Sequence, residues 1–471
     1  MNTYSRREMA KISASALLAW QGLRCTTARG DGGARKPNFV VILTDDQGYQ
    51  ALGCYGAKKF KTPHVDCMAA GGMRFTDFYS AAPVCTPARA ALLTGCYPPW
   101  VNMETVLFPD SKTGLNPAEQ TLPRVLKAAG YTTACIGKWH LGHLPEFLPL
   151  RHGFDEFFGL PYSNDLIPAD QPGGRAGSTY PPLPMMEGDK TVQTNPDQRL
   201  LTRRFTSRAV DFIKRQGQRP FFLYVAHSMP HVPVFASDQF AGKSLAGKYG
   251  DAMEEIDWST GEILRTIRDL GVEKDTVVLF TSDNGPWLRS GKYGDLIPAD
   301  EEGSALPLRG GKFTTYEGGM RVPCVVYAPG RVPAAKTCSE LCGTIDLLPT
   351  FARMAGAPLR DGLQLDGKDI GSVLAGDAKA KSPHASFYYS RSAELQAIRR
   401  GHWKLLSLPA PQSGQQRVLE LYDLANDIAE ARNLAAANPA LVVDLQQAMT
   451  AFDADLKANR RPLGRTGGGR R

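Results

Sequence analysis

Short apolar runs that each lead directly into polar residues dominate the hydrophobic pattern of this chain. Four of them are rich in β-branched and aromatic residues and are too short for helices, so they predict buried strands. These runs cover residues 39–43, 131–136, 221–226 and 276–280. Amphipathic stretches between them, at 119–129, 198–215 and 252–270, predict helices. Alternating strands and helices predict an α/β fold with a large, mostly parallel sheet covered by helices on both faces.

The residues that follow the apolar runs are of types that carry chemistry. Ligands of parallel sheets bind beyond the carboxyl ends of the strands, so these side chains should meet at one edge. They are Asp45, Asp46, Lys138, His140, His231, Asp283 and Asn284. Three carboxylates and an amide oxygen suit calcium or magnesium rather than zinc, for which no histidine spacing exists. Positive charge and proton transfer around an anionic group would come from Lys138, His140, His231 and Lys312.

The pentapeptide Cys85-Thr86-Pro87-Ala88-Arg89 places a nucleophile close to a cation. Proline suits the first turn of a helix, so we expect a helix over residues 87–93 that stops at Thr94-Gly95. Cys85 and Arg89 are four positions apart and would share one face at its N-terminus, the end that attracts anions. This arrangement suits an oxyanion ester. A buried structural cysteine is the alternative, since free cysteine is among the most buried residue types.

Charge is distributed unevenly along the 471 residues. The net charge is +8, but residues 1–36 carry +5 and residues 457–471 carry +6, so the stretch between them carries −3. A mildly acidic globule with basic ends does not favour a nucleic-acid partner. Nine cysteines occur without zinc-type spacing, and only Cys338 and Cys342 are close enough in sequence to bridge, so we expect no disulfide framework.

The N-terminus predicts export. Residues 1–36 carry Ser5-Arg6-Arg7 ahead of a weakly apolar run that is too short to span a bilayer, as in a twin-arginine signal followed by a linker. We therefore expect a bacterial protein that is exported to the periplasm or beyond, with no stable membrane insertion.

Three further regions follow from the pattern. Residues 37–370 contain the strands that end in chemistry and form the predicted catalytic domain. Residues 371–458 predict a small antiparallel sheet with one helix, from short strands near 387–389, 396–406 and 418–422 and a helix over 440–457. Residues 459–471, rich in arginine and glycine, predict a disordered basic tail.

Two motifs resemble signatures of a known family. Cys85-Thr86-Pro87-Ala88-Arg89 with Leu93-Thr94-Gly95 is similar to one signature of the type I sulfatases, and Lys138-Trp139-His140-Leu141-Gly142 is similar to a second. The resemblance covers residues 37–435 and is greatest to the branch of arylsulfatase A and N-acetylgalactosamine-6-sulfatase. These formylglycine-dependent enzymes belong to the alkaline-phosphatase superfamily. The resemblance therefore implies a sulfuric ester hydrolase with a large mixed sheet sandwiched by helices and a small C-terminal antiparallel sheet.

The resemblance also implies a role for each candidate residue. Cys85 would be oxidised by a separate maturation enzyme to formylglycine, whose hydrated aldehyde attacks sulfur through one hydroxyl and expels sulfate through the other. The implied calcium ligands are Asp45, Asp46, Asp283, Asn284 and the modified residue 85. Arg89 would hold the hydrated aldehyde, and His140 would be the base. The implied sulfate-binding residues are Lys138, Ser163, His231 and Lys312, with His231 or Lys312 protonating the leaving oxygen.

Two other functions would need similar residues. A phosphonate or phosphodiester hydrolase could share the scaffold, because tetrahedral phosphorus and sulfur esters need similar anion and metal groups. A non-catalytic protein that binds sulfated glycans would keep Cys85 as a plain thiol. The expected substrate is a sulfated small molecule or, by preference, a carbohydrate, and the Pro- and Gly-rich insert over 168–197 is expected to form the rim that selects it. The sequence leaves the oligomeric state open.

Overall fold

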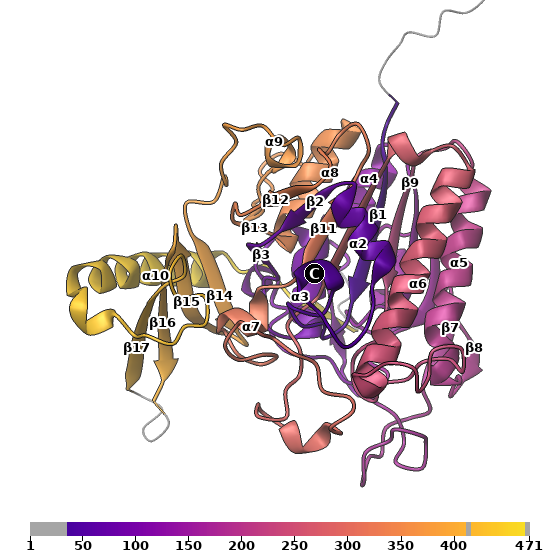
Figure 1. The fold of residues 1–471 in the computed structure, drawn as a ribbon, viewed down its shortest axis with the longest axis horizontal. Coiled ribbons are helices and arrows are strands. Elements are labelled where there is room, and N and C mark those ends of the chain that lie inside the picture. The colour runs from indigo at the N-terminus through magenta and orange to yellow at the C-terminus, as the bar shows by residue number, and fades with distance from the viewer. Residues whose placement is uncertain (1–34, 411–415, 467–471) are drawn as a thin grey trace, which may run out of the picture. The chain divides into compact units, whose positions relative to one another are not determined.

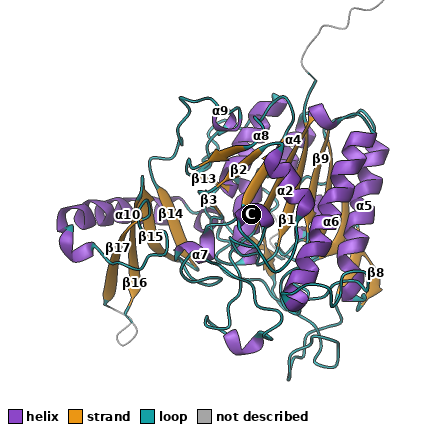
Figure 2. Cartoon of the chain, in the orientation of Figure 1, coloured by secondary structure: helices purple, strands orange, loops and turns teal. Residues whose placement is uncertain are grey.

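A ten-stranded mixed sheet organises the chain in a computed structural model that describes residues 35–410 and 416–466 (Figures 1 and 2). In spatial order the strands are β12 (Lys336–Cys338), β2 (Met73–Phe75), β11 (Cys324–Tyr327), β10 (Thr276–Ser282), β1 (Asn38–Thr44), β9 (Phe221–Ala226), β5 (Thr132–Lys138), β6 (Glu156–Leu160), β7 (Pro184–Glu187) and β8 (Lys190–Thr194). The five central strands from β10 to β6 are parallel, and antiparallel neighbours flank them on both sides. The predicted mostly parallel sheet is confirmed.

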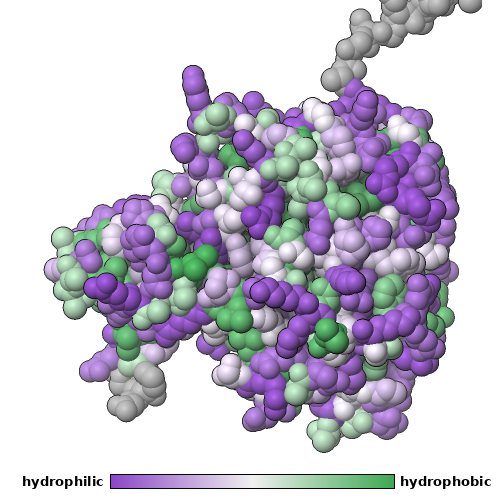
Figure 3. Space-filling view, viewed as in Figure 1, coloured by the Kyte–Doolittle hydropathy of each residue, from purple (hydrophilic) through white to green (hydrophobic). Residues whose placement is uncertain are grey.

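Helices cover both faces of this sheet, as strands that are apolar throughout require. One face is covered by α2 (Pro63–Ala70), α5 (Leu201–Gln216) and α6 (Gly247–Asp269), and the other by α3 (Cys85–Thr94), α4 (Leu122–Ala128) and α8 (Leu347–Ala355). In β1, Val40 and Ile42 pack on the first side, whereas Phe39 packs on the second, with its ring 4.3 Å from that of Phe351. Figure 3 shows hydrophilic residues spread over the outer side of α5 and α6.

The register of the central strands brings their carboxyl ends level. Thr44 at the end of β1 lies beside Ser282 at the end of β10, and Leu43 lies beside Ala226 at the end of β9. Ala226 in turn pairs with Gly137 in β5. The residues that follow these positions therefore emerge at one edge, although they are far apart in the sequence.

A second sheet of four antiparallel strands forms the C-terminal part of the described chain. It comprises β14 (Phe387–Arg391), β15 (Glu394–Arg400), β16 (Trp403–Pro409) and β17 (Arg417–Asp423), and α10 (Pro439–Asn459) packs against it. One face packs on α10 through Ile398 and Leu405, and the other packs on the main body through Tyr389 and Leu406. The predicted small sheet with one helix is confirmed.

The remaining elements are short. They are β3 (Phe78–Tyr79) paired with β13 (Cys342–Gly343), β4 (Thr113–Gly114) paired with β18 (Gly464–Arg465), α7 (Glu317–Met320) and α9 (Gly371–Leu374). The insert over 168–197 contributes β7 and β8 at the edge of the main sheet.

The described start of the C-terminal tail differs from the expectation of disorder. The Arg461 amide donates to the Trp100 carbonyl, and its side chain pairs with Glu119 at 3.0 Å. Residues 464–465 add a strand to β4. Disorder was expected because the segment is basic and rich in glycine, but a buried carboxylate and a free strand edge, both distant in sequence, hold it in place.

Two further expectations concern the described residues only. Within 35–410 and 416–466, no helix combines the length and the apolar character needed to cross a membrane. The eight cysteines in these ranges are free thiols, including Cys338 and Cys342. The predicted export signal lies outside the described residues, apart from its last two positions.

Candidate active site

Cys85 is the first residue of α3 and is 2% exposed. The helix begins two residues earlier than expected and ends at Thr94, where Gly95 takes a left-handed conformation with φ 69°. The Thr86 hydroxyl donates to the His140 carbonyl at 2.9 Å, which joins this helix to the segment after β5. Burial raises the pKa of the Cys85 thiol, although Lys138 and Lys312 lie nearby. The unmodified side chain is therefore a protonated thiol at neutral pH and a weak nucleophile.

Arg89 joins α3 to the ends of two strands. Its guanidinium donates from Nε and Nη2 to Asp283 Oδ2, at 2.9 and 2.8 Å, and from Nη1 to the Lys138 carbonyl at 2.7 Å. Asp45 Oδ2 lies 3.3 Å from Nη2. All four residues are buried, so the guanidinium fixes the relative positions of β1, β5 and β10 at their carboxyl ends.

The oxygen-bearing side chains after β1 and β10 form one cluster. The Asp46 amide donates to Asp283 Oδ1 at 3.2 Å, and Asn284 Nδ2 donates to Asp46 Oδ1 at 2.6 Å. Asp46 has φ 61°, a left-handed conformation that aspartate tolerates better than most residues. This backbone turn lets two successive carboxylates, Asp45 and Asp46, reach the same site.

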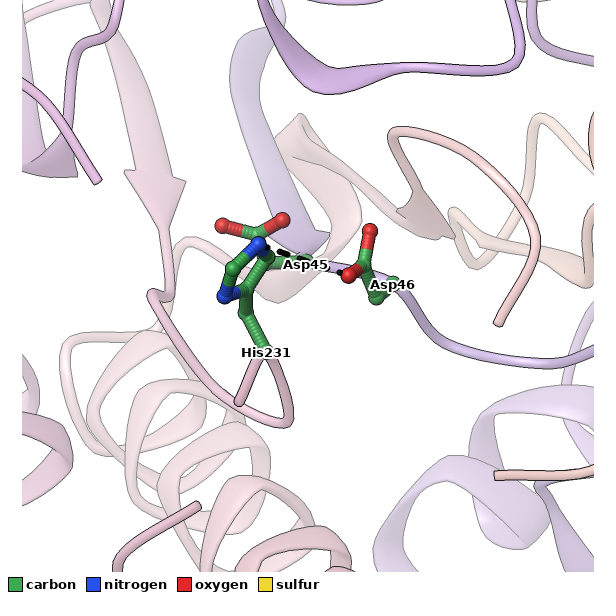
Figure 4. A group of neighbouring side chains, drawn as sticks. All are labelled: Asp45, Asp46 and His231. Atoms are coloured by element: carbon green, nitrogen blue, oxygen red, sulfur yellow. Dashed lines mark ion pairs between the residues drawn. The ribbon is translucent and has the colours of Figure 1, made fainter. Parts of the chain in front are cut away.

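Three cationic or titratable side chains face these carboxylates. Lys138 Nζ contacts Asp45 Oδ2 at 2.5 Å and Ser163 Oγ at 3.0 Å. Lys312 Nζ lies 2.8 Å from Asp46 Oδ2, and His231 Nε2 lies 3.5 Å from the same oxygen. Figure 4 shows the His231 ring turned toward Asp45 and Asp46.

The charges in the cluster shift one another's pKa values. Burial alone would raise the pKa of Asp45, but Lys138, His231 and Arg89 hold it well below its usual range. Burial, together with the neighbouring Asp45 carboxylate, raises the pKa of Asp283 to about 7. Burial alone would lower the pKa of Lys312, but Asp46 raises it above its ordinary value. Lys312 is therefore protonated at neutral pH.

His140 is held as a neutral base. Its Nε2 lies 2.9 Å from the Leu107 carbonyl, which can only accept, so the proton is on Nε2 and Nδ1 carries the lone pair. Nδ1 is buried and has no hydrogen-bond partner. Burial lowers the pKa of His140 well below its usual value, and Lys138 lowers it further. The residue has φ 60°, which orients the ring differently from a continued strand.

The structure brings together every candidate residue predicted from the sequence. They are Asp45, Asp46, Cys85, Arg89, Lys138, His140, Ser163, His231, Asp283, Asn284 and Lys312. His227, directly after β9, is buried with its Nε2 3.3 Å from the Ser259 hydroxyl. The sequence reasoning missed Asp165, Arg175 and Trp287, which line the same site. Asp165 lies two positions after the predicted Ser163, which is a local signal for its place at the site. No sequence spacing indicates that its partner is an arginine from the insert.

The cluster fits a hard divalent cation. Asp45 Oδ1 and Asn284 Oδ1 are buried without a hydrogen-bond partner, and such oxygens are costly unless a cation or donor satisfies them. Asp45, Asp46 and His231 each offer an atom within 4.8 Å of the others'. Carboxylate and amide oxygens are the donors that calcium and magnesium prefer. The residues therefore fit a divalent metal.

Known proteins resemble this chain in sequence and in fold. The chain matches the family model described as Sulfatase over residues 37–357 and the model described as N-sulphoglucosamine sulphohydrolase, C-terminal, over residues 311–455. It is 41% identical over 419 residues to N-acetylgalactosamine-6-sulfatase of Canis lupus familiaris, covering 84% of this chain and 76% of that protein. It is 38% identical over 464 residues to arylsulfatase A of Homo sapiens, covering 91% and 90%.

Solved structures of other proteins are similar to this fold. The PsFucS1 sulfatase from Pseudoalteromonas sp. is similar with a TM-score of 0.79 and 27% identity, covering 98% of this chain and 97% of that one. A phosphonate monoester hydrolase of Agrobacterium radiobacter, at 19% identity and a TM-score of 0.61, shares the fold alone.

The chain belongs to the sulfatase family. It is a sulfuric ester hydrolase with the alkaline-phosphatase-like fold of that family. The predicted family, fold class and enzyme class are confirmed.

Proposed function

We propose that this chain releases inorganic sulfate from a carbohydrate sulfate, or from an aryl sulfate, using formylglycine formed at Cys85 and a bound Ca²⁺. The observation that carries the proposal is the position of Cys85. It lies buried at the N-terminus of α3, among Lys138, Lys312 and the oxygen cluster. A thiol there is protonated and weakly reactive, whereas a hydrated aldehyde would present hydroxyl groups to the same cations.

Each group around position 85 has a distinct task. Formylglycine supplies a hydroxyl nucleophile and a second hydroxyl for release of sulfate. Lys138, Ser163, His231 and Lys312 bind the sulfate oxygens. The Arg89 guanidinium, fixed by Asp283, holds residue 85 and balances its negative charge. The His140 Nδ1 lone pair accepts a proton, since Nε2 is committed to Leu107. Lys312 or His231 donates a proton to the leaving oxygen.

The metal has four side-chain ligands in this proposal. Asp45, Asp46, Asp283 and Asn284 would hold Ca²⁺ together with residue 85. A bound divalent cation supplies Lewis-acid stabilisation of negative charge on sulfate and on the nucleophile. Lys138 and Arg89 help to hold the pKa of Asp45 well below its usual range, so this ligand is ionised.

The relatives support a carbohydrate substrate. One is named for N-acetylgalactosamine 6-sulfate, and a solved structure at 30% identity, titled Ps i-CgsB, holds k-i-k-neocarrahexaose. Export through the signal predicted over residues 1–36, and maturation by a formylglycine-generating enzyme, complete the proposal.

Mass spectrometry and turnover together test this function. Trypsin releases residues 75–89, and in protein from a host with the maturation enzyme we expect the aldehyde in place of the thiol. Sulfate release should be absent in Cys85→Ala, which should keep the wild-type melting temperature. Unmodified cysteine in an active protein would overturn the mechanism. A strong preference for an aryl phosphodiester over every sulfate would favour the phosphonate or phosphodiester hydrolase instead.

A further inference from the structure

A charged pair, Arg175 and Asp165, lies beside the sulfate-binding residues but contacts none of the metal ligands. Arg175 Nη2 lies 2.6 Å from Asp165 Oδ2. The Asp165 side chain is 8% exposed. The Arg175 side chain, in the part of the 168–197 insert before β7, is 36% exposed. The pair therefore joins a buried acceptor to a donor that solvent, or a ligand, can reach.

Two contacts place this pair next to the reaction centre. Asp165 lies two positions after Ser163, whose hydroxyl contacts Lys138 at 3.0 Å. Burial alone would raise the pKa of Asp165, but His231, Arg175 and a hydrogen bond from Ser163 lower it. The Arg175 guanidinium lies 5.4 Å from the centre of the Trp287 ring. The same ring is 4.7 Å from Lys312 Nζ and 5.7 Å from the ring of His231. Arg175 is thus one residue removed from the groups that would hold the sulfate.

A second aromatic pair, Phe108 and Tyr180, lies near Asp165 and Arg175. The rings of Phe108 and Tyr180 stack at 6.4 Å, and Phe108 is 41% exposed. Phe108 follows Leu107, whose carbonyl orients His140. Burial, and then Asp165, raises the pKa of Tyr180. Apolar walls with a few converging polar groups are the usual lining of small-molecule sites.

The net charge of the pair identifies the group that it binds. Asp165 neutralises the charge of Arg175, so the pair should bind a second anionic group only weakly. It offers guanidinium donors and a carboxylate acceptor close together, and a hydroxyl group can both donate and accept. We infer that Asp165 and Arg175 bind hydroxyl groups of the alcohol part of the ester and so select a sugar sulfate over an aryl sulfate. This inference rests on the proposed function of the adjoining site.

Arg175→Ala and Asp165→Asn test the inference with two kinds of substrate. The probes are 4-nitrophenyl sulfate, which has no hydroxyl, and the best substrate among galactose 6-sulfate, N-acetylgalactosamine 6-sulfate and glucosamine 6-sulfate. A hydrogen bond to a charged group is worth about 1.5–3 kcal/mol, so each variant should raise KM for the sugar by roughly 10- to 100-fold. The kinetics with 4-nitrophenyl sulfate should stay within about twofold of wild type. Lysine has fewer donors than arginine, so the KM of Arg175→Lys for the sugar sulfate should lie between those of Arg175→Ala and wild type.

Arg208→Ala is the matched control. Arg208 has a side-chain exposure of 40%, a carboxylate partner in Glu187 and an aromatic ring, Phe158, beneath its guanidinium, but it lies on α5. The Arg208→Ala variant should keep wild-type kinetics with both the sugar sulfate and 4-nitrophenyl sulfate. Equal losses on sugar and aryl sulfates in Arg175→Ala would overturn the inference, as would an unchanged KM for the sugar sulfate. A wild-type protein that cleaves no sulfate would instead overturn the proposed function itself.

Discussion

The Arg89 guanidinium binds a single carboxylate oxygen of Asp283, because Nε and Nη2 both donate to Oδ2. The other oxygen, Oδ1, accepts a hydrogen bond from the Asp46 amide. One arginine on α3 thereby sets the position of an oxygen cluster built by two strands. Burial and the neighbouring Asp45 carboxylate raise the pKa of Asp283 to about 7. The Arg89 guanidinium acts in the opposite direction and favours the ionised form of Asp283.

Arg89→Lys should remove most of the activity while retaining the charge. A lysine has one terminal nitrogen and cannot bond Asp283 Oδ2 twice and the Lys138 carbonyl as well. We expect kcat to fall by about 100-fold, as for loss of one preorganised electrostatic contact. Arg124→Lys is the control, since Arg124 also bonds several backbone carbonyls but lies outside the site. A folded Arg89→Lys protein with wild-type kcat would contradict the role given to Arg89.

Removal of divalent metal should lower both activity and melting temperature. Ca²⁺ that binds only the folded chain stabilises it by mass action, so chelation should lower Tm and re-addition should restore it. Asp45→Asn should abolish the Ca²⁺-dependent rise in Tm. Asp77→Asn is the control, because Asp77 is likewise mostly buried but pairs with Arg321 and Arg399. Full activity in a metal-free sample would count against the calcium site.

His152→Phe should make stability less sensitive to acid. Burial and then Arg124 lower the pKa of His152 to about 3, against an ordinary value of 6.5. The folded state therefore binds fewer protons than the unfolded state between these values. The stability that neutral His152 contributes is complete above about pH 6.5 and is lost as the pH falls toward 3. This accounts for about 2–3 kcal/mol of the free energy of unfolding between pH 7 and 4.5.

Urea unfolding at pH 7 and pH 4.5 measures the effect. Phenylalanine can replace the ring that packs 5.4 Å from Trp139, so the difference between the two pH values should shrink in the variant. His402→Phe, at a half-exposed position, should leave the difference unchanged. An identical difference in His152→Phe and wild type would refute the assignment.

Lys404→Met should destabilise the junction with the C-terminal sheet. Lys404 Nζ lies 2.8 Å from Glu317 Oε1 and 2.9 Å from Glu430 Oε1, and all three side chains are fully buried. Glu430 would lose its buried ion-pair partner, whereas Glu317 would keep Arg321 at 3.3 Å, and breaking such a buried pair costs about 3–5 kcal/mol. Glu317 begins α7, directly after the loop that carries Lys312, so activity should be lost at lower urea concentration than in wild type.

Lys381→Met is the control for this pair of measurements. Lys381 is 79% exposed and pairs with Glu340 at the surface, where an ion pair contributes little. Equal unfolding midpoints for Lys404→Met and Lys381→Met would show that the buried ion pairs do not hold the junction.

Much of the architecture follows from local pattern. The apolar runs predicted β1, β5, β9 and β10, because a strand buried on both faces must be apolar throughout. The rule that ligands bind at the carboxyl ends of parallel strands then predicted which side chains would meet. Helix bounds were less exact: α4 begins at Leu122 rather than 119, and α6 begins at Gly247 rather than 252. Tertiary packing decides these ends.

The sequence by itself determined the family, the alternation of the central strands with helices, and the residue types at the site, since each depends on local composition or on motifs of fixed spacing. Only the tertiary structure decided how the side chains are paired. The two bonds from Arg89 to one oxygen of Asp283, the Leu107 carbonyl that sets the His140 tautomer, and the Arg175–Asp165 pair join residues without a constant separation in sequence. Their geometry depends on strand register and on left-handed backbone at Asp46 and His140, which arise when the sheet is assembled.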